Sequence, residues 1–152
     1  MPKEVFAFND PAFRQELLPG LAREVFVALE TCPAKHLSFW IVRGSKPKGE
    51  PTEQAKELPM KIMYDVHEGT EEGVYVVKGR MRLMTPNENV ILEQGGCGWV
   101  PAGMPHIMAP VTEDLADEVV ILCIYGPARS GKAKMHLVTA EEAKKIAKKL
   151  TG

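Results

Sequence analysis

The sequence predicts an all-β fold in which helices occur only near the two ends of the chain. Short runs of β-branched, aromatic and other apolar residues recur through the middle of the chain, and glycine or proline separates them. The segment Arg80–Met84 alternates between polar and apolar side chains, which is the period of a half-buried strand. Many short strands at even spacing are typical of a β-barrel or a β-sandwich.

The composition is that of an ordinary globular protein, and it narrows the classes of function. The chain has 152 residues, of which 45% are hydrophobic and 26% charged, and its formal net charge is -1. We expect one domain over residues 1–152 and neither a nucleic-acid nor a membrane partner. The N-terminus lacks the apolar core of a signal peptide. Three widely spaced cysteines argue against a disulfide framework, so a cytoplasmic location is expected.

The first third of the chain is predicted to contain a short helix and two strands. A helix over about residues 10–18 is expected, because Asn9 or Asp10 could cap it and Pro19-Gly20 would end it. Residues 24–29 and 36–42 are rich in β-forming residues and are predicted strands. The polar residues 44–58 contain two glycines and two prolines, so we expect either a mobile edge of a ligand pocket or a disordered surface loop.

Further apolar segments complete the predicted barrel, which should span about residues 22–126. The expected strands cover residues 59–67, 72–78, 80–84, 90–93, 99–100, 107–108 and 118–125. The last of these is the longest apolar run and is expected at the centre of a sheet. A helix is predicted over about residues 140–150, because Thr139 and Glu142 form a capping box and apolar residues follow at helical spacing.

Four side chains near the middle of the sequence carry donor atoms that suit a divalent metal ion. Asp65 and His67 are two residues apart on a predicted strand, so both can face the same side of a sheet. Glu72 begins the next strand, and His106 is the best candidate for a fourth donor. Imidazole and carboxylate donors suit Fe, Mn, Ni or Zn, and the sequence does not select among these metals.

The chain resembles the cupin superfamily in two motifs, which read here Asp65-x-His67-x4-Glu72-x6-Gly79 and Gly95-x5-Pro101-x-Gly103-x2-His106. The family motifs are His-x-His-x3-4-Glu-x6-Gly and Gly-x5-Pro-x-Gly-x2-His-x3-Asn. The resemblance covers roughly residues 60–110 and implies a cupin-type jelly-roll β-barrel. Two positions depart from it: Asp65 stands where the first motif histidine is expected, and Pro110 stands where the asparagine is expected.

By this resemblance His67, Glu72 and His106 are expected metal ligands, whereas Asp65 carries over only by its position. Asp65 could ligate the metal, support a ligand, or act as a base beside a bound water. Asp65 and Glu72 are therefore the candidate catalytic residues. Some cupins have lost their metal and serve as scaffolds or binding modules, but a buried Glu72 without a partner would be costly.

The resemblance implies a metal-dependent enzyme that acts on a small oxygenated metabolite, with a dioxygenase favoured over an isomerase or lyase. The alternative is a non-catalytic module that binds a small molecule or carbohydrate. A homodimer is expected, formed through a sheet edge near Val25.

His36 and His136 lie outside the motifs and are expected to be structural or exposed. Cys97 and Cys123 are not expected to be nucleophiles.

Overall fold

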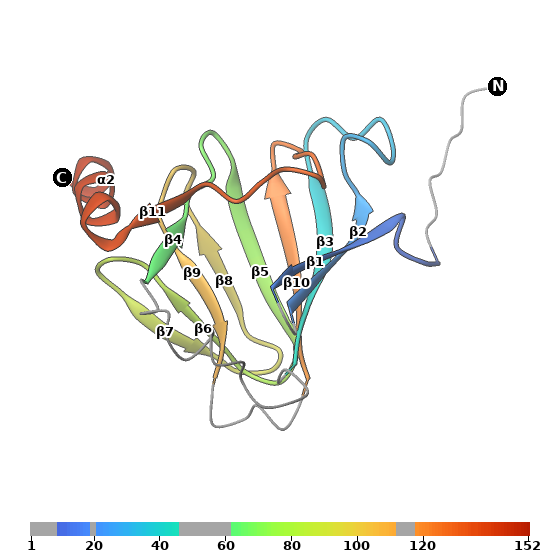
Figure 1. Cartoon of the computed structure of the whole chain (residues 1–152), viewed down its shortest axis with the longest axis horizontal. Coiled ribbons are helices and arrows are strands. Elements are labelled where there is room, and N and C mark those ends of the chain that lie inside the picture. The colour runs from blue at the N-terminus through green and yellow to red at the C-terminus, as the bar shows by residue number, and fades with distance from the viewer. Residues whose placement is uncertain (1–8, 19–20, 46–61, 112–117) are drawn as a thin grey trace, which may run out of the picture.

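The computed structural model describes residues 9–18, 21–45, 62–111 and 118–152, and these residues form mainly β-structure (Figure 1). The elements in chain order are β1 (Phe13–Leu18), β2 (Leu21–Val27), β3 (Ser38–Gly44), β4 (Met63–Asp65), β5 (Glu71–Lys78), β6 (Met81–Met84), β7 (Asn89–Leu92), β8 (Cys97–Val100), β9 (Ile107–Pro110), β10 (Val119–Gly126), β11 (Leu137–Thr139) and α2 (Ala140–Thr151).

The described strands form three antiparallel sheets. The largest has six strands in the order β1-β2-β3-β10-β5-β8, and the others have the orders β7-β6-β9 and β11-β4. Figure 1 shows the two smaller sheets and the helix on one side of strands β5, β10 and β3 of the large sheet. The fold is thus rich in β-structure as predicted, but the hydrogen-bond ladders of the described strands do not join into one closed barrel.

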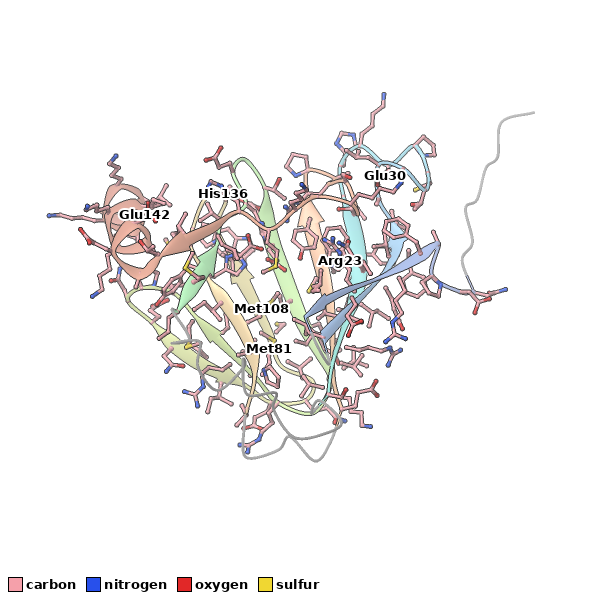
Figure 2. All side chains as sticks on the ribbon, in the orientation of Figure 1. Arg23, Glu30, Met81, Met108, His136 and Glu142 are labelled. Atoms are coloured by element: carbon pink, nitrogen blue, oxygen red, sulfur yellow. The ribbon has the colours of Figure 1, made fainter. Side chains whose placement is uncertain are left out.

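Side-chain packing, rather than a continuous ladder, joins the large sheet to the three-stranded sheet. The main core contains buried residues of β2, β3, β5 and β10 together with Met81 of β6, which is 0% exposed. Met108 of β9 packs against the same cluster, and Figure 2 shows Met81 and Met108 in the interior of the molecule. Apolar burial between the sheets is therefore the main stabilising interaction at this end of the fold.

The helix predicted over residues 10–18 is wrong, because most of this segment forms strand β1. Strand β1 pairs with β2, and the register places Phe13 opposite Val25 and Arg14 opposite Glu24. Phe13 packs against the main core, and the opposite charges of the second pair also favour this register. Long-range pairing therefore overrides a local pattern that suggested a helix.

The other predicted elements are largely confirmed, with shifts at their ends. Strand β10 lies between β3 and β5, as expected for the longest apolar run. Of the strand predicted over residues 59–67, residues 59–61 lie outside the described residues, and β4 is the part of the remainder that forms a strand. The capping box is present, since the backbone N–H groups of Thr139 and Glu142 each donate to the other's side chain. No helix in the described ranges is long and apolar enough to cross a membrane. Most of the predicted loop at 44–58 lies outside the described residues.

Gly79, the last residue of the first motif, is required by its backbone and by its neighbours. Its φ is +76°, and an added Cβ would meet Val119 Cγ2 at 3.1 Å and Glu118 O at 3.4 Å. Gly95 has a similar φ of +84°, but an added Cβ would meet nothing within 4 Å. Both positions would strain the backbone of an added alanine, but only Gly79 would also bring its Cβ into close contact with neighbouring atoms.

We expect Gly79→Ala to lower the free energy of unfolding more than Gly95→Ala does. A left-handed conformation costs a non-glycine residue roughly 1–2 kcal/mol, so both variants should be destabilised by about that amount. Gly79→Ala adds the contact with β10 on top of this strain. Urea unfolding of both variants measures the difference, and equal losses would show that the contact at β10 is relieved without cost.

Candidate metal centre

Backbone hydrogen bonds hold the segment around His67 beside the segment around His106. Asp65 and His106 form an isolated antiparallel bridge, with N–H···O distances of 2.9 and 3.0 Å in the two directions. The N–H of Gly103, whose φ is +76°, donates to the His67 carbonyl at 2.8 Å. The glycine of the second motif thus makes the turn that keeps the two histidines adjacent.

Glu72 reaches the same place from the inner face of the large sheet. On β5 it lies opposite Tyr125 of β10 on one side and opposite Val100 of β8 on the other. Its side chain is 0% exposed, and those of His67 and His106 are 6% and 2% exposed. One ligand atom from each of these three residues lies within 4.8 Å of the other two, so the fold assembles a buried His-Glu-His cluster.

The carboxylate of Glu72 is the centre of this cluster. Oε2 lies 3.0 Å from His67 Nε2 and 2.9 Å from His106 Nε2, and Oε1 accepts a hydrogen bond of 2.6 Å from the Tyr125 hydroxyl. Burial alone would raise the pKa of Glu72, but hydrogen bonds and charge from both histidines outweigh it and lower that pKa to about 2. Glu72 is therefore a buried carboxylate anion, and its two oxygens form hydrogen bonds with two imidazoles and one phenol.

The hydrogen bonds also determine which ring nitrogens carry protons. The Met104 carbonyl can only accept, so His106 Nδ1 is the donor across their distance of 2.9 Å. The Arg129 guanidinium can only donate, so His67 Nδ1 accepts from it at 2.8 Å, and the ring proton of His67 is on Nε2. The Glu72 carboxylate can also only accept, and although burial lowers the pKa of His106, the hydrogen bond and charge of Glu72 outweigh this and raise it. Both Nε2 atoms therefore point an N–H group at Glu72.

Asp65 lies next to this cluster but is not part of it. Its Oδ2 is 3.8 Å from His67 Nε2, whereas Oδ1 accepts hydrogen bonds from the backbone N–H groups of Val66 and His136 at 3.0 and 2.9 Å. One oxygen is thus engaged in holding the neighbouring backbone, and the other is turned towards the histidine. The structure brings together three of the four predicted site residues and places the fourth beside them.

The remaining predicted residues behave mainly as expected. His36 and His136 are exposed, and their side chains are outside the cluster. Cys123 is fully buried, and burial raises the pKa of its thiol well above the usual value, so it is not poised as a nucleophile.

Sequence reasoning missed two residues that contact the cluster, Tyr125 and Arg129. Tyr125 is recognisable only from the register that places it opposite Glu72. Burial raises the pKa of its hydroxyl well above the usual value, so the hydroxyl remains a neutral donor. Arg129 is in a polar segment after β10, where no local pattern distinguishes it. The backbone N–H of Arg129 donates a hydrogen bond of 2.9 Å to Ser38 Oγ, and this bond holds the segment against β3.

Comparisons with known proteins agree with the geometry. A family model described as "Cupin domain" matches residues 59–125, which include the whole His-Glu-His cluster and Tyr125. No curated protein matches the chain.

Solved structures share the fold at low sequence identity. KdgF from Halomonas sp. is 17% identical with a TM-score of 0.59, and the match covers 84% of this chain and 96% of that one. An RmlC-like cupin from Shewanella frigidimarina NCIMB 400 is 18% identical with a TM-score of 0.55, covering 84% and 94%. Oxalate decarboxylase from Lactobacillus farciminis, in a formate complex, is 16% identical with a TM-score of 0.57, covering 86% and 34%.

The cluster predicts how the stability of the metal-free protein depends on pH. The pKa of Glu72 falls from 4.5 to about 2 on folding, so its contribution is complete above pH 4.5 and is lost as the pH falls towards 2. The pKa of His106 rises above 6.5 on folding, so its contribution is complete below pH 6.5 and is lost as the pH rises through the folded value. Together these groups favour stability between pH 4.5 and 6.5.

Urea unfolding of EDTA-treated protein across pH tests this dependence. The loss on the acid side should be of the order of a few kcal/mol, because the pKa of Glu72 is lowered to about 2, and stability should also fall on the alkaline side, because the pKa of His106 is raised. Glu72→Gln removes the carboxylate that causes both shifts, so its stability profile should be flatter on the acid and on the alkaline side. Identical slopes in the variant and the wild type would mean that other groups control the pH dependence.

Proposed function

Because this chain is a member of the cupin superfamily, we propose that it is a metal-dependent enzyme with a small oxygenated metabolite as substrate. The observation that carries the proposal is the convergence of His67, Glu72 and His106 in a buried site. Two imidazoles and one carboxylate are the donors that Fe, Mn, Ni and Zn take in proteins. The identity of the metal is left to measurement.

The hydrogen bonds of His106 and Glu72 fit a metal site, whereas the bond from Arg129 to His67 Nδ1 would have to break when a metal binds. His106 donates Nδ1–H to the Met104 carbonyl, and ligating histidines generally use their second nitrogen in this way, which orients the ring and raises its basicity. The Tyr125 hydroxyl donates a hydrogen bond to Oε1 of Glu72, and Oε2 lies between the two imidazoles. In the metal-free protein, ring N–H groups supply the positive charge beside Oε2, so metal binding would release protons.

A bound metal would supply a Lewis acid that holds and polarises the oxygen atoms of the substrate. The chain's own residues would do the rest. His67, Glu72 and His106 would hold the ion, and Tyr125 would keep Glu72 in place. We propose Asp65 as a base or orienting group, because Oδ1 is bound to backbone N–H groups and Oδ2 faces His67. A direct ligand role for Asp65 is the alternative that the variants below distinguish.

A dioxygenase is our finer proposal. With Asp65 outside the cluster, the donor set is two histidines and one carboxylate, which is the set used by non-haem iron oxygenases. An isomerase or lyase would use the same site to polarise a carbonyl without consuming oxygen. A non-catalytic binding module would need no metal, so metal content is the first discriminating observation.

Metal stoichiometry by elemental analysis tests the proposed site. His67→Ala, Glu72→Gln and His106→Ala each remove a donor, so metal affinity should fall by orders of magnitude. Loss of a group that only supports a ligand typically costs about 10- to 100-fold. His36→Ala is the matched control, because His36 is an exposed histidine outside the cluster, and it should keep the metal.

Three variants of Asp65 separate its possible roles. If Asp65 is a ligand, Asp65→Ala should lose the metal as His106→Ala does. If it is a base, Asp65→Asn should keep the metal and lose turnover. Asp65→His restores the usual family residue and should keep the metal in either case. Full metal occupancy in both histidine-to-alanine variants of the cluster would show that the proposed site is wrong.

We also propose a cytoplasmic homodimer. The three cysteines are free, which suits a reducing compartment. Val25 is on β2, which is flanked by β1 and β3, so it does not supply an open sheet edge. The outer face of the large sheet is a better candidate, because Trp99 and Ile124 are 60% and 42% exposed and both lie beside Gly73, which has no side chain to separate them.

Light scattering of the wild type should give twice the chain mass of 16.8 kDa at micromolar concentration. Trp99→Lys places a charge in the proposed interface, so it should shift the protein to monomer. Val90→Lys is the control, because Val90 is 47% exposed but belongs to a different sheet. A monomeric wild type, or a dimer that Trp99→Lys leaves intact, would contradict this interface.

A further inference from the structure

Arg23 is a buried arginine on a strand that belongs to the core. Its side chain is 6% exposed, and Figure 2 shows it in the interior of the molecule. On β2 it is opposite Val42 of β3 and two residues from the fully buried Val25. Its guanidinium carbon lies 5.1 Å from the centre of the Trp40 ring. An arginine is rarely buried on such an apolar face without a charged partner.

The acceptors around Arg23 are all neutral. Nη2 donates to Gln15 Oε1 at 2.6 Å and to the Ala133 carbonyl at 3.3 Å. Nε is buried and has no acceptor among the described residues. Nor does any carboxylate in the described part of the chain form an ion pair with this guanidinium. A buried charge with an unsatisfied N–H group is costly unless an anion binds beside it.

A continuous set of ring contacts leads from Arg23 to the metal cluster. The rings of Trp40 and Tyr125 have centres 4.2 Å apart, and the Tyr125 ring is 5.5 Å from that of His67. Arg129 lies over the other end of this set, with its guanidinium carbon 5.1 Å from the Tyr125 ring centre. Two cationic groups therefore flank a pair of aromatic rings whose phenol is hydrogen-bonded to Glu72.

The charge of this region also favours an anion. The guanidinium groups of Arg23 and Arg129 balance the carboxylates of Asp65 and Glu72, so a bound divalent cation would leave a net positive charge. Guanidinium groups bind planar carboxylates through paired N–H groups, and stack readily on aromatic rings.

We propose that Arg23 and Arg129 bind the carboxylate of the substrate, which is a small organic acid with a second oxygen next to the carboxylate. This inference rests on the proposed function, because the second oxygen is the group that would meet the metal. Arg23 supplies its Nε–H group, and Arg129 supplies guanidinium N–H groups, including the one that is bonded to His67 in the metal-free protein. A 2-oxo acid or a short dicarboxylic acid meets these requirements.

Isothermal titration calorimetry with defined probes tests the substrate class. Pyruvate and malonate represent the proposed acids, inorganic phosphate represents another anion, and glycerol is a neutral control. Each probe is titrated into metal-loaded and EDTA-treated protein. Charge-assisted hydrogen bonds contribute about 1.5–3 kcal/mol, so Arg23→Met should weaken carboxylate binding roughly 10- to 100-fold. Arg23→Lys keeps the charge without the planar fork and should give an intermediate loss.

The matched control is Arg14→Met, which removes an exposed arginine from the neighbouring strand. It should change carboxylate affinity less than about twofold. Metal stoichiometry should be the same in Arg23→Met, Arg23→Lys and Arg14→Met. Trp99→Phe leaves Trp40, which contacts Arg23, as the only tryptophan, and its intrinsic fluorescence gives a second reading that does not depend on whether Arg23→Met folds. Carboxylates, but not glycerol, should change this fluorescence.

The outcomes separate this inference from the proposed function. Carboxylate binding that depends on Arg23 in a protein without metal would support the anion site and contradict the metal enzyme. Metal binding without any carboxylate binding, or an Arg23→Met variant that binds carboxylates as the wild type does, would overturn the anion site alone. Phosphate binding more tightly than both acids would overturn the proposed substrate class.

Discussion

The buried carboxylate of Glu72 is the interaction on which the rest of the site depends. It accepts hydrogen bonds from His67, His106 and Tyr125, which come from three other segments of the chain. Its position is set by the pairing of β5 with β10 and β8, so the main sheet fixes it before any ligand binds. Without this charge, two ring N–H groups and one phenol would be buried without an acceptor, which would destabilise all three segments together.

The sequence predicted the parts of the fold and site that depend on local spacing. The motif glycines and the capping box of Thr139 and Glu142 follow from residues close together in the chain. The cluster of His67, Glu72 and His106 was expected instead from the resemblance of two separate motifs to those of a family. The residues that sequence reasoning missed depend on long-range pairing. Residues 13–18 form strand β1 because they pair with β2. Tyr125 contacts Glu72 because the register of β10 with β5 places the two residues opposite each other. The inward position of Arg23 follows from the same pairing, which no local pattern reveals.

The site therefore divides between two parts of the chain. The segment that matches the family, residues 59–125, contains the three candidate metal ligands and Tyr125. Arg23 precedes that segment and Arg129 follows it, and both reach the aromatic pair of Trp40 and Tyr125. In this arrangement the segment that matches the family would supply the metal chemistry, and the flanking segments would select the substrate.

Arg129 would couple these two parts, because it cannot keep its present acceptor when a metal binds. His67 accepts from Arg129 at Nδ1 and carries its proton on Nε2. A neutral His67 that ligates through Nε2 must instead carry the proton on Nδ1, where it can no longer accept from a guanidinium. Arg129 then loses one acceptor, and a substrate carboxylate is the group that would replace it. Metal and acid would thus favour each other's binding, and linkage requires the effect to be equal in both directions.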